Sequence, residues 1–157
     1  MIQGFGVFAL GDFEAGEQIF DIDDSDVVSD FSKLTRHDYE FELDYLESGK
    51  VVRLRPPFRC VNHSCNPNAY VKTIDGQRKA LAMREIRVGE EITYDYSTNG
   101  YSDGTFECHC GSRNCRKVYH GNFFGLPRAT QIRYLPYIED WFKSEHKEDF
   151  ESLLGSL

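Results

Sequence analysis

The decisive stretch of the chain reads Arg59-Cys60-Val61-Asn62-His63-Ser64-Cys65-Asn66-Pro67-Asn68. It is dense in polar side chains, although segments with the apolar pattern of β-strands stand on both sides of it, at 51–55 and 69–73. Pro56-Pro57 ends the first of these segments before the polar stretch begins. This contrast makes the stretch the leading functional motif of the sequence.

Short strands are expected throughout the first hundred residues, because β-branched and aromatic residues alternate there between turn signals. These strands are predicted over 6–10, 18–22, 51–55, 69–73, 78–82 and 91–96. Asp75-Gly76 lies between two of them and predicts a hairpin. A loop rich in Gly, Ser and Asn is expected over 97–104. The fold class is therefore mostly β with a few helices.

Helices are expected in two places. Residues 35–47 carry apolar side chains at helical spacing, and Thr35 with Asp38 resembles a capping start. The tail after Cys115 carries an apolar stripe at the same spacing, made by Ile132, Leu135, Ile138, Trp141 and Phe142. We expect this stripe to pack on the β body, and a helix that binds a partner is the alternative.

Three of the five cysteines lie within Cys108-His109-Cys110-Gly111-Ser112-Arg113-Asn114-Cys115. The odd number and the lack of a visible signal peptide argue against a disulfide framework. Zinc prefers four soft ligands in a tetrahedron, and one loop can supply several closely spaced cysteines. A fourth ligand is still required, and the candidates are Cys60, Cys65, His109 and His120. Such a closed site is structural, so it does not by itself indicate catalysis.

Charge is distributed unevenly along the 157 residues, whose net charge is −8. Residues 1–32 hold eight acidic residues and no Lys or Arg, whereas the rest of the chain carries 18 of each sign. Binding to nucleic acid through its phosphates needs a basic face, so we expect no direct nucleic-acid contact. A basic partner is favoured by long-range attraction, and a merely solvated acidic face is the alternative.

No apolar run approaches the roughly 20 residues of a membrane helix, and no signal peptide is visible. We therefore expect an intracellular protein that does not contact a membrane. It would be nuclear in a eukaryote and cytoplasmic otherwise.

Four motifs, in their order and spacing, closely resemble the SET-domain protein lysine methyltransferases. They are Gly4-Phe5-Gly6-Val7-Phe8-Ala9, the Asn62-His63-Ser64-Cys65-Asn66-Pro67-Asn68 run, Glu91-Ile92-Thr93-Tyr94-Asp95-Tyr96 and the cluster over 108–115. A Gly-x-Gly alone is a weak signal. The Asn-His-Ser-Cys-x-Pro-Asn run is a specific signal for the family. Its occurrence together with a downstream Tyr-Asp-Tyr and a Cys-x-Cys-x4-Cys makes the resemblance still more specific. The resemblance extends from residue 4 to about 118.

This resemblance implies small curved β-sheets around a pseudoknot, in which the segment ending at Tyr96 passes through the loop made by residues 62–65. Threading of this kind is rare in proteins. It also implies a SET domain over 1–104, a post-SET zinc-binding segment over 105–118 and a C-terminal helical extension over 119–157. The family's post-SET zinc ion is held by three cysteines and the motif cysteine, which match Cys65, Cys108, Cys110 and Cys115.

The implied reaction is methyl transfer from S-adenosylmethionine to a lysine ε-amine. Tyr96 matches the family's catalytic tyrosine. A phenol with a pKa near ~10 is a poor general base at neutral pH, so we expect its hydroxyl to position and stabilise the reacting groups. Tyr94 matches the residue that sets how many methyl groups are added, and a tyrosine there implies mono- or dimethyl-lysine.

Cofactor contacts are implied for two further motifs. Asn62 and His63 match the family's cofactor-binding pair. Gly4 and Phe5 match its N-terminal cofactor contact, where a missing Cβ allows the backbone to approach the ligand.

Three more residues are expected near the cofactor. Phe106 stands two residues before the cysteine cluster and is expected to pack on the adenine. Arg59 is expected to meet the cofactor carboxylate, and an ion pair with Asp95 is the alternative. Tyr45 is expected to line the site, and a core aromatic of the 35–47 helix is the alternative.

The expected partner is a basic protein or peptide, typically a histone tail, bound by a monomer. A catalytically silent SET module that binds a peptide is the second reading, but its mark would be loss of Tyr96 or of Asn62-His63, and neither is lost. A purely structural zinc module is the third reading, and it would not need the Tyr-Asp-Tyr.

Overall fold

The computed structural model describes residues 4–155, apart from the side chains at positions 40, 41 and 103. Residues 1–3 of the expected SET domain and residues 156–157 of the expected C-terminal extension lie outside the described residues. The fold is mostly β with a few helices, as predicted. Its strands are β1 (Val7–Phe8), β2 (Gln18–Asp21), β3 (Leu43–Tyr45), β4 (Val51–Arg53), β5 (Asn62–His63), β6 (Ala69–Ile74), β7 (Gln77–Ala82), β8 (Glu91–Tyr94), β9 (Tyr101–Glu107) and β10 (Val118–Asn122). Its α-helices are α1 (Arg36–Phe41), α2 (Arg128–Tyr134), α3 (Asp140–Glu145) and α4 (Lys147–Gly155).

The central hairpin is formed by β6 and β7, and β2 extends it to three strands in the order β2-β7-β6. Its pairing runs from Ala69 opposite Ala82 to Ile74 opposite Gln77. The predicted turn is confirmed, since φ is 52° at Asp75 and 77° at Gly76. Two consecutive left-handed residues match the strand twist of a two-residue hairpin, which is why Asp-Gly is favoured there.

A second sheet, ordered β1-β8-β5, joins three of the motifs. β1 is antiparallel to β8, whereas β5 is parallel to it, with Asn62 opposite Thr93 and His63 opposite Tyr94. The side chain of Asn68, which is 1% exposed, fixes this arrangement by donating to the Glu91 carbonyl and accepting from the Thr93 amide. The two segments expected to form the pseudoknot are therefore neighbours in one sheet.

The expected helix over 35–47 is shorter in the structure. The capping prediction is confirmed, because the Asp38 amide donates to Thr35 Oγ1 at 3.2 Å and the Thr35 amide donates to Asp38 Oδ2 at 2.7 Å. The helix nevertheless ends at Phe41, and β3 follows, with Leu43 opposite Arg53 of β4. A helix of two turns has little stability of its own. Residues 43–45 therefore pair with β4 as a strand instead of continuing the helix.

The expected loop over 97–104 is also partly wrong, because β9 begins at Tyr101 and pairs with β10. Gly100 makes this pairing possible. A Cβ at Gly100 would lie only 2.5 Å from the Gly121 carbonyl oxygen, so the two backbones approach more closely than any other residue would allow. The strand depends on a partner that is distant in sequence, which local composition does not reveal.

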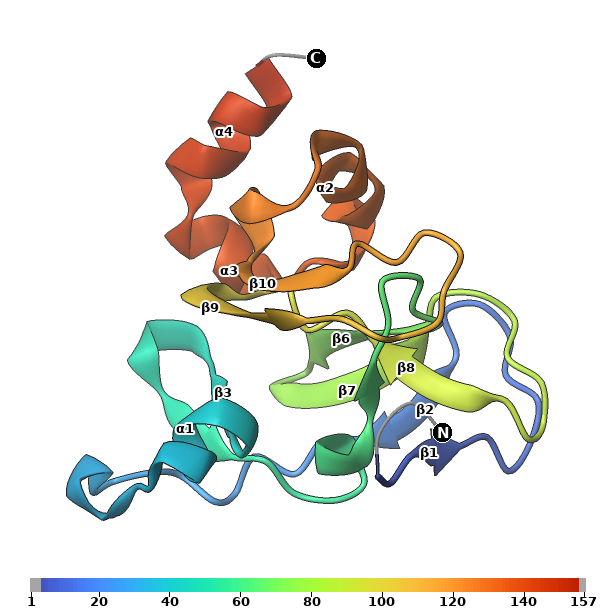
Figure 1. Ribbon diagram of the computed structural model, residues 1–157, viewed down its shortest axis with the longest axis horizontal. Coiled ribbons are helices and arrows are strands. Elements are labelled where there is room, and N and C mark those ends of the chain that lie inside the picture. The colour runs from blue at the N-terminus through green and yellow to red at the C-terminus, as the bar shows by residue number, and fades with distance from the viewer. Residues whose placement is uncertain (1–3, 156–157) are drawn as a thin grey trace.

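The C-terminal segment builds a core of its own, which the expected packing of the apolar stripe on the β body did not include. Ile138 and Phe142 are at most 1% exposed, and they pack with residues of the 3-10 helix η4 (Phe123–Gly125) and of α4. Figure 1 shows α2, α3 and α4 on one side of the β9–β10 ribbon, with β6, β7 and β8 on the other. Tyr70 of β6 meets Tyr137 with ring centroids 4.9 Å apart, so the segment also packs on the β body. Within residues 4–155, no helix combines the length and apolar character needed to cross a bilayer.

Candidate active site and metal centre

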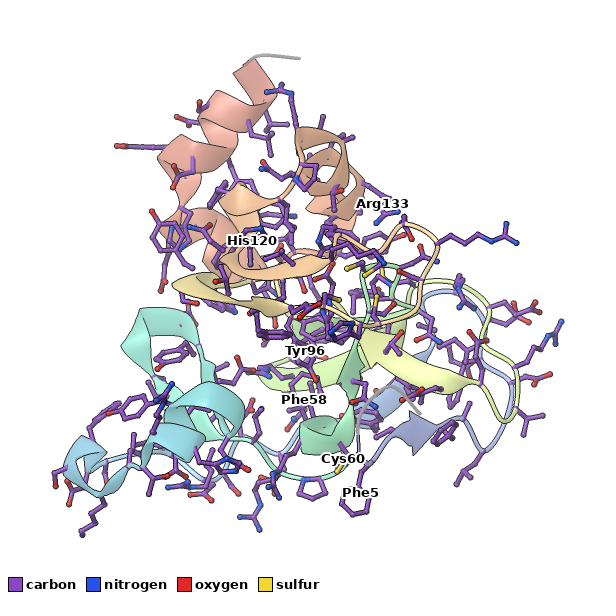
Figure 2. All side chains as sticks on the ribbon, viewed as in Figure 1. Phe5, Phe58, Cys60, Tyr96, His120 and Arg133 are labelled. Carbon is purple, nitrogen blue, oxygen red and sulfur yellow. The ribbon has the colours of Figure 1, made fainter. Side chains whose placement is uncertain are left out.

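Two tyrosines at the end of β8 form the centre of an aromatic cluster. The ring centroids of Tyr94 and Tyr96 are 6.3 Å apart, and Phe58 lies 5.8 Å from Tyr94. Figure 2 shows Tyr96 near the middle of the molecule, with Phe58 just below it in this view and Phe5 at the lower edge. Tyr96 as a residue is 38% exposed, so it can meet a ligand without leaving the cluster.

The Tyr96 hydroxyl has a fixed orientation. It donates to the Val61 carbonyl oxygen at 2.6 Å, on the polar stretch that precedes β5. Burial raises the pKa of Tyr96 to about 12, so the phenol keeps its proton at neutral pH. Because its one proton is committed to Val61, its oxygen lone pairs remain available to accept from another group.

His63 connects this cluster to the cysteines. Its Nδ1 accepts from the Tyr96 amide at 3.2 Å. A backbone amide can only donate, so the ring proton is on Nε2, which lies 3.5 Å from Cys65 Sγ. Burial lowers the pKa of His63 to about 4, so the ring is neutral and its Nε2–H is directed at the sulfur.

Four cysteines converge beside His63. The Sγ atoms of Cys65, Cys108, Cys110 and Cys115 all lie within 4.8 Å of one another. The Cys65–Cys108 and Cys108–Cys115 sulfur separations are both 3.7 Å. A tetrahedron of thiolates around zinc, with bonds of ~2.3 Å, places its sulfurs roughly 3.8 Å apart. The donor set therefore fits one zinc ion, and it is the arrangement that the resemblance implied.

The other candidates for the fourth ligand lie outside this group. The His109 side chain is 74% exposed and faces Glu107 at 3.3 Å. Among the described residues, the cluster of possible metal ligands includes neither Cys60 nor His120.

Backbone amides also point at the sulfurs. The Arg116 amide lies 3.4 Å from Cys65 Sγ, and the Lys117 amide lies 3.4 Å from Cys115 Sγ. Burial raises the pKa of the Cys65 thiol, so a thiolate at this position needs these donors and a cation to persist. The chemistry of the cluster, like its geometry, suits a metal.

Asp95, between the two tyrosines, is fully buried and holds a network. Its carboxylate accepts from Arg116 Nη1 at 2.7 Å and Nη2 at 2.9 Å, and from the Tyr134 hydroxyl of α2 at 2.9 Å. Burial opposes its charge, yet the Arg116 guanidinium keeps the pKa of Asp95 below its usual value. One carboxylate thus joins the tyrosine motif to the residue after Cys115 and to the C-terminal helices.

The expected alternative of an Arg59–Asp95 ion pair is wrong. Arg116 is the guanidinium that pairs with Asp95, and it bonds to both carboxylate oxygens. Arg59 instead donates to Glu42, the residue that follows α1. Its side chain is 47% exposed, which leaves it accessible to a ligand.

Tyr45 lies on β3 rather than in a helix, and 53% of it is exposed. The alternative that it is a core aromatic of a helix is therefore wrong. Its exposure leaves it free to meet a ligand.

Gly4 and Phe5, the N-terminal residues expected to contact a cofactor, lie beside Asn62 at the start of β5. Asn62 Nδ2 donates to the Phe5 carbonyl at 2.9 Å and to Glu91 Oε1 at 2.6 Å, so its side chain tethers the N-terminal segment. Gly4 has φ of 56°, and a Cβ there would meet nothing within 4 Å. The Phe5 side chain is 84% exposed. Open backbone and an uncovered ring are the features of a surface that a flat ligand can cover.

Tyr119 of β10 is a site residue that sequence reasoning missed. Its ring stacks on Phe106 at 4.3 Å and lies 5.6 Å from His63 and 6.2 Å from Tyr96. Phe106 is 47% exposed on the outer side of this stack. Tyr119 belongs to no motif, and only its place on the strand after the cysteine cluster could have suggested it.

Comparison with known proteins gives consistent matches. A family model described as the SET domain matches residues 4–97. Histone-lysine N-methyltransferase trithorax of Drosophila virilis is 32% identical over 128 residues, which are 74% of this chain and 3% of that protein. The H3 lysine-36 specific histone-lysine N-methyltransferase of Candida albicans is 33% identical over 135 residues, 76% of this chain and 16% of that protein. The crystal structure of KRYPTONITE in complex with mCHG DNA and SAH has a TM-score of 0.55 at 22% identity, over 73% of this chain and 26% of that chain, which supports the fold.

Proposed function

The chain belongs to the SET-domain family, and from this premise we propose that it is an S-adenosylmethionine-dependent protein lysine N-methyltransferase. The observation that carries the proposal is the parallel pairing of β5 with β8, which brings His63 beside Tyr94 and Tyr96. A catalytically silent module would have no need for a tyrosine hydroxyl fixed by a buried carbonyl.

We propose that the cofactor binds at the open surface formed by Gly4 and Phe5, next to Asn62 and the buried His63, with Phe106 on its adenine side and Arg59 and Tyr45 at its edge. When bound, it supplies an electrophilic methyl group whose carbon–sulfur bond breaks as the lysine nitrogen forms its new bond. Asn62 contributes by holding the Phe5 backbone, because its side-chain amide is already engaged by protein. Phe106 contributes an uncovered ring supported from behind by Tyr119.

Catalysis then requires a neutral, aligned lysine. The free amine has a pKa of ~10.4, and an apolar channel lowers it by desolvation. Rings of Phe58, Tyr94 and Tyr96 supply such walls. The Tyr96 oxygen, held by its bond to Val61, accepts from the amine and polarised methyl, and alignment supplies the remaining rate enhancement. The proton leaves through water, because a phenol with a pKa of about 12 is protonated and cannot receive it.

Tyr94 is proposed to restrict the product to mono- or dimethyl-lysine. Each methyl group removes one N–H donor from the amine and adds volume. A hydroxyl at this position holds a water or an amine N–H in the space that a further methyl would need.

A single structural zinc ion is proposed on Cys65, Cys108, Cys110 and Cys115. It would fasten the 105–118 segment to the SET domain over 1–104 and so support Phe106. The 119–157 segment is proposed as a C-terminal helical extension that packs on this body, although residues 119–122 at its start belong to β10 and pair with β9.

The proposed substrate is a basic, histone-like tail, bound by a monomer in a nucleus. The acidic first third of the chain suits such a partner. Two relatives are named histone-lysine methyltransferases, and one of these is specific for H3 lysine 36, which supports the substrate class. The chain spans 16% or less of these two proteins, so their further domains give no guide to its own partners.

The test is to incubate the protein with labelled S-adenosylmethionine and separate pools of histones, ribosomal proteins and total basic protein. Methylated lysines are then mapped by mass spectrometry. A Tyr96→Phe protein that still binds the cofactor serves as the control. Transfer to a lysine by the wild type alone supports the proposal. Cofactor or peptide binding with no transfer to any pool would favour the silent module.

A further inference from the structure

We infer that Asn99 is a positioning residue for Tyr94, and that through it the C-terminal helices help to set the number of methyl groups added. The inference rests on the proposed function. Asn99 lies just beyond the residues 4–97 that the family model matches, so nothing in that match assigns it a role.

The Tyr94 hydroxyl has two protein partners. It donates to the Thr98 carbonyl oxygen at 3.0 Å, and Asn99 Nδ2 lies 3.4 Å from its oxygen. The Thr98 acceptor is itself fixed, because the Thr98 amide and hydroxyl both bond to the Asp95 carbonyl, at 2.9 and 2.6 Å. The phenol proton is therefore committed to Thr98.

The orientation of the Asn99 amide follows from its other partner. Asn99 Oδ1 accepts from the Glu139 backbone amide at 2.9 Å. Since a backbone amide can only donate, the oxygen of Asn99 must face Glu139, and its NH₂ group must face Tyr94. The backbone also suits asparagine at this position, because φ at Asn99 is 57°, a left-handed value that asparagine tolerates better than most residues.

Glu139 is anchored on the β body. It is 2% exposed, and its carboxylate accepts from the Thr73 amide at 2.8 Å and from Thr73 Oγ1 at 3.1 Å. Lys72 Nζ adds a bond to the Ile138 carbonyl at 2.8 Å, on the residue before Glu139. The donor that orients Asn99 thus belongs to the start of α3 and is fixed by β6.

Counting hydrogen-bond sites gives the consequence for chemistry. A phenol has one proton and two acceptor positions. In Tyr94, Thr98 takes the proton and Asn99 fills one acceptor position, which leaves one for a water or a substrate amine N–H. With one acceptor position left in a fixed direction, the Tyr94 oxygen favours an amine that still has an N–H to donate over a more methylated amine. Without Asn99 the direction of this position is no longer fixed, so the preference for the less methylated amine is weaker.

Two variants separate this role from simple tethering. Asn99→Asp keeps the shape and an acceptor for Glu139, and it tolerates the left-handed backbone, but it presents no donor to Tyr94. Asn99→Gly removes both contacts without backbone strain. The readout is the ratio of the next methyl transfer to the first, measured by intact-peptide mass spectrometry on the lysine mapped for the wild type. Thermal unfolding and cofactor calorimetry report whether each variant is folded and binds.

Both variants should raise this ratio by roughly two- to tenfold, the effect of losing one neutral hydrogen bond. Neither should change it in a Tyr94→Phe background, because the hydroxyl that Asn99 orients is then missing. A wild-type ratio in Asn99→Asp, or an equal rise in the Tyr94→Phe background, would overturn the positioning role while leaving the methyltransferase intact. A wild type that transfers no methyl group would overturn the proposed function and this inference with it.

Discussion

Replacing Asp95 by asparagine should destabilise the protein more than the loss of any surface ion pair. The change preserves the shape of the side chain but removes its charge and one acceptor. Arg116 Nη1 and Nη2 lie 2.7 and 2.9 Å from two different carboxylate oxygens, so the guanidinium loses one of these bonds together with its counter-charge. The Arg116 side chain is 11% exposed and Asp95 is not exposed at all, so water cannot replace the lost contact.

Removing one partner of a buried ion pair costs about 3–5 kcal/mol, because it leaves an uncompensated charge in the interior. For a domain of this size, 1 kcal/mol shifts Tm by about 2–4 °C, so we expect Tm to fall by roughly 6–20 °C. A typical domain has only about 5–15 kcal/mol of stability in total. The Asp95→Asn protein should therefore be close to unfolding at physiological temperature.

Urea unfolding at neutral pH measures the effect, with Trp141, the single tryptophan, as the fluorescent probe beside Phe142. Asp12→Asn is the matched control. It makes the same chemical change in the Asp12–Arg87 pair, whose side chains are 50% and 61% exposed, and an exposed pair contributes little.

A second variant tests whether the cost comes from the unpaired charge. Arg116→Gln combined with Asp95→Asn should recover part of the lost stability, since both charges are then gone. If Asp95→Asn and Asp12→Asn lower the urea midpoint equally, the buried network does not stabilise the fold and the reasoning fails.

Tyr96→Phe should lower methyl transfer about 10²–10³-fold while calorimetry shows unchanged cofactor binding, because only the aligned hydroxyl is lost; unchanged turnover would remove its catalytic role. With a pKa of about 12, Tyr96 should contribute no inflection to the wild-type rate profile between pH 7 and 10, and an inflection that disappears in Tyr96→Phe would contradict this. Cys110→Ser should lower zinc content, measured by elemental mass spectrometry, and cofactor affinity together, and full affinity in the zinc-free variant would show that the two are independent. Tyr94→Phe should carry the same lysine one methyl further in a time course with excess cofactor, whereas abundant trimethyl-lysine from the wild type would show that other residues set the product.

Local signals were enough to predict several parts of the structure. Asp75-Gly76 required a hairpin because few residue pairs adopt two left-handed conformations in succession. The cysteine spacing predicted that Cys108, Cys110 and Cys115 converge, because one short loop can present three thiols to a single point, whereas Cys65 as the fourth sulfur followed from the family resemblance. Thr35 with Asp38 predicted the start of α1, because both capping bonds are made within four consecutive residues.

Features that depend on a distant partner were predicted less well. Charge alone allowed Arg59 to pair with Asp95, but in the structure Arg116 meets Asp95 and Arg59 meets Glu42. The helix over 35–47 is cut short by pairing with β4, and the 97–104 loop becomes strand by pairing with β10. In each case the competing interaction comes from a segment that local periodicity does not include.

The Tyr-Asp-Tyr motif explains how such a small fold can hold a precise site. Successive residues of an extended chain point to opposite faces, so the two tyrosines can share one face while Asp95 takes the other. Asp95 is bound there by Arg116 and Tyr134, and the Thr98 carbonyl, fixed by the turn that follows, receives the Tyr94 proton. The positions of the two hydroxyls are therefore determined by a buried carboxylate between them and by segments far along the chain. A change in α2 that disturbs Tyr134 should thus be felt at the tyrosines and, through Arg116, beside the cysteines, because Asp95 bonds to both Tyr134 and Arg116.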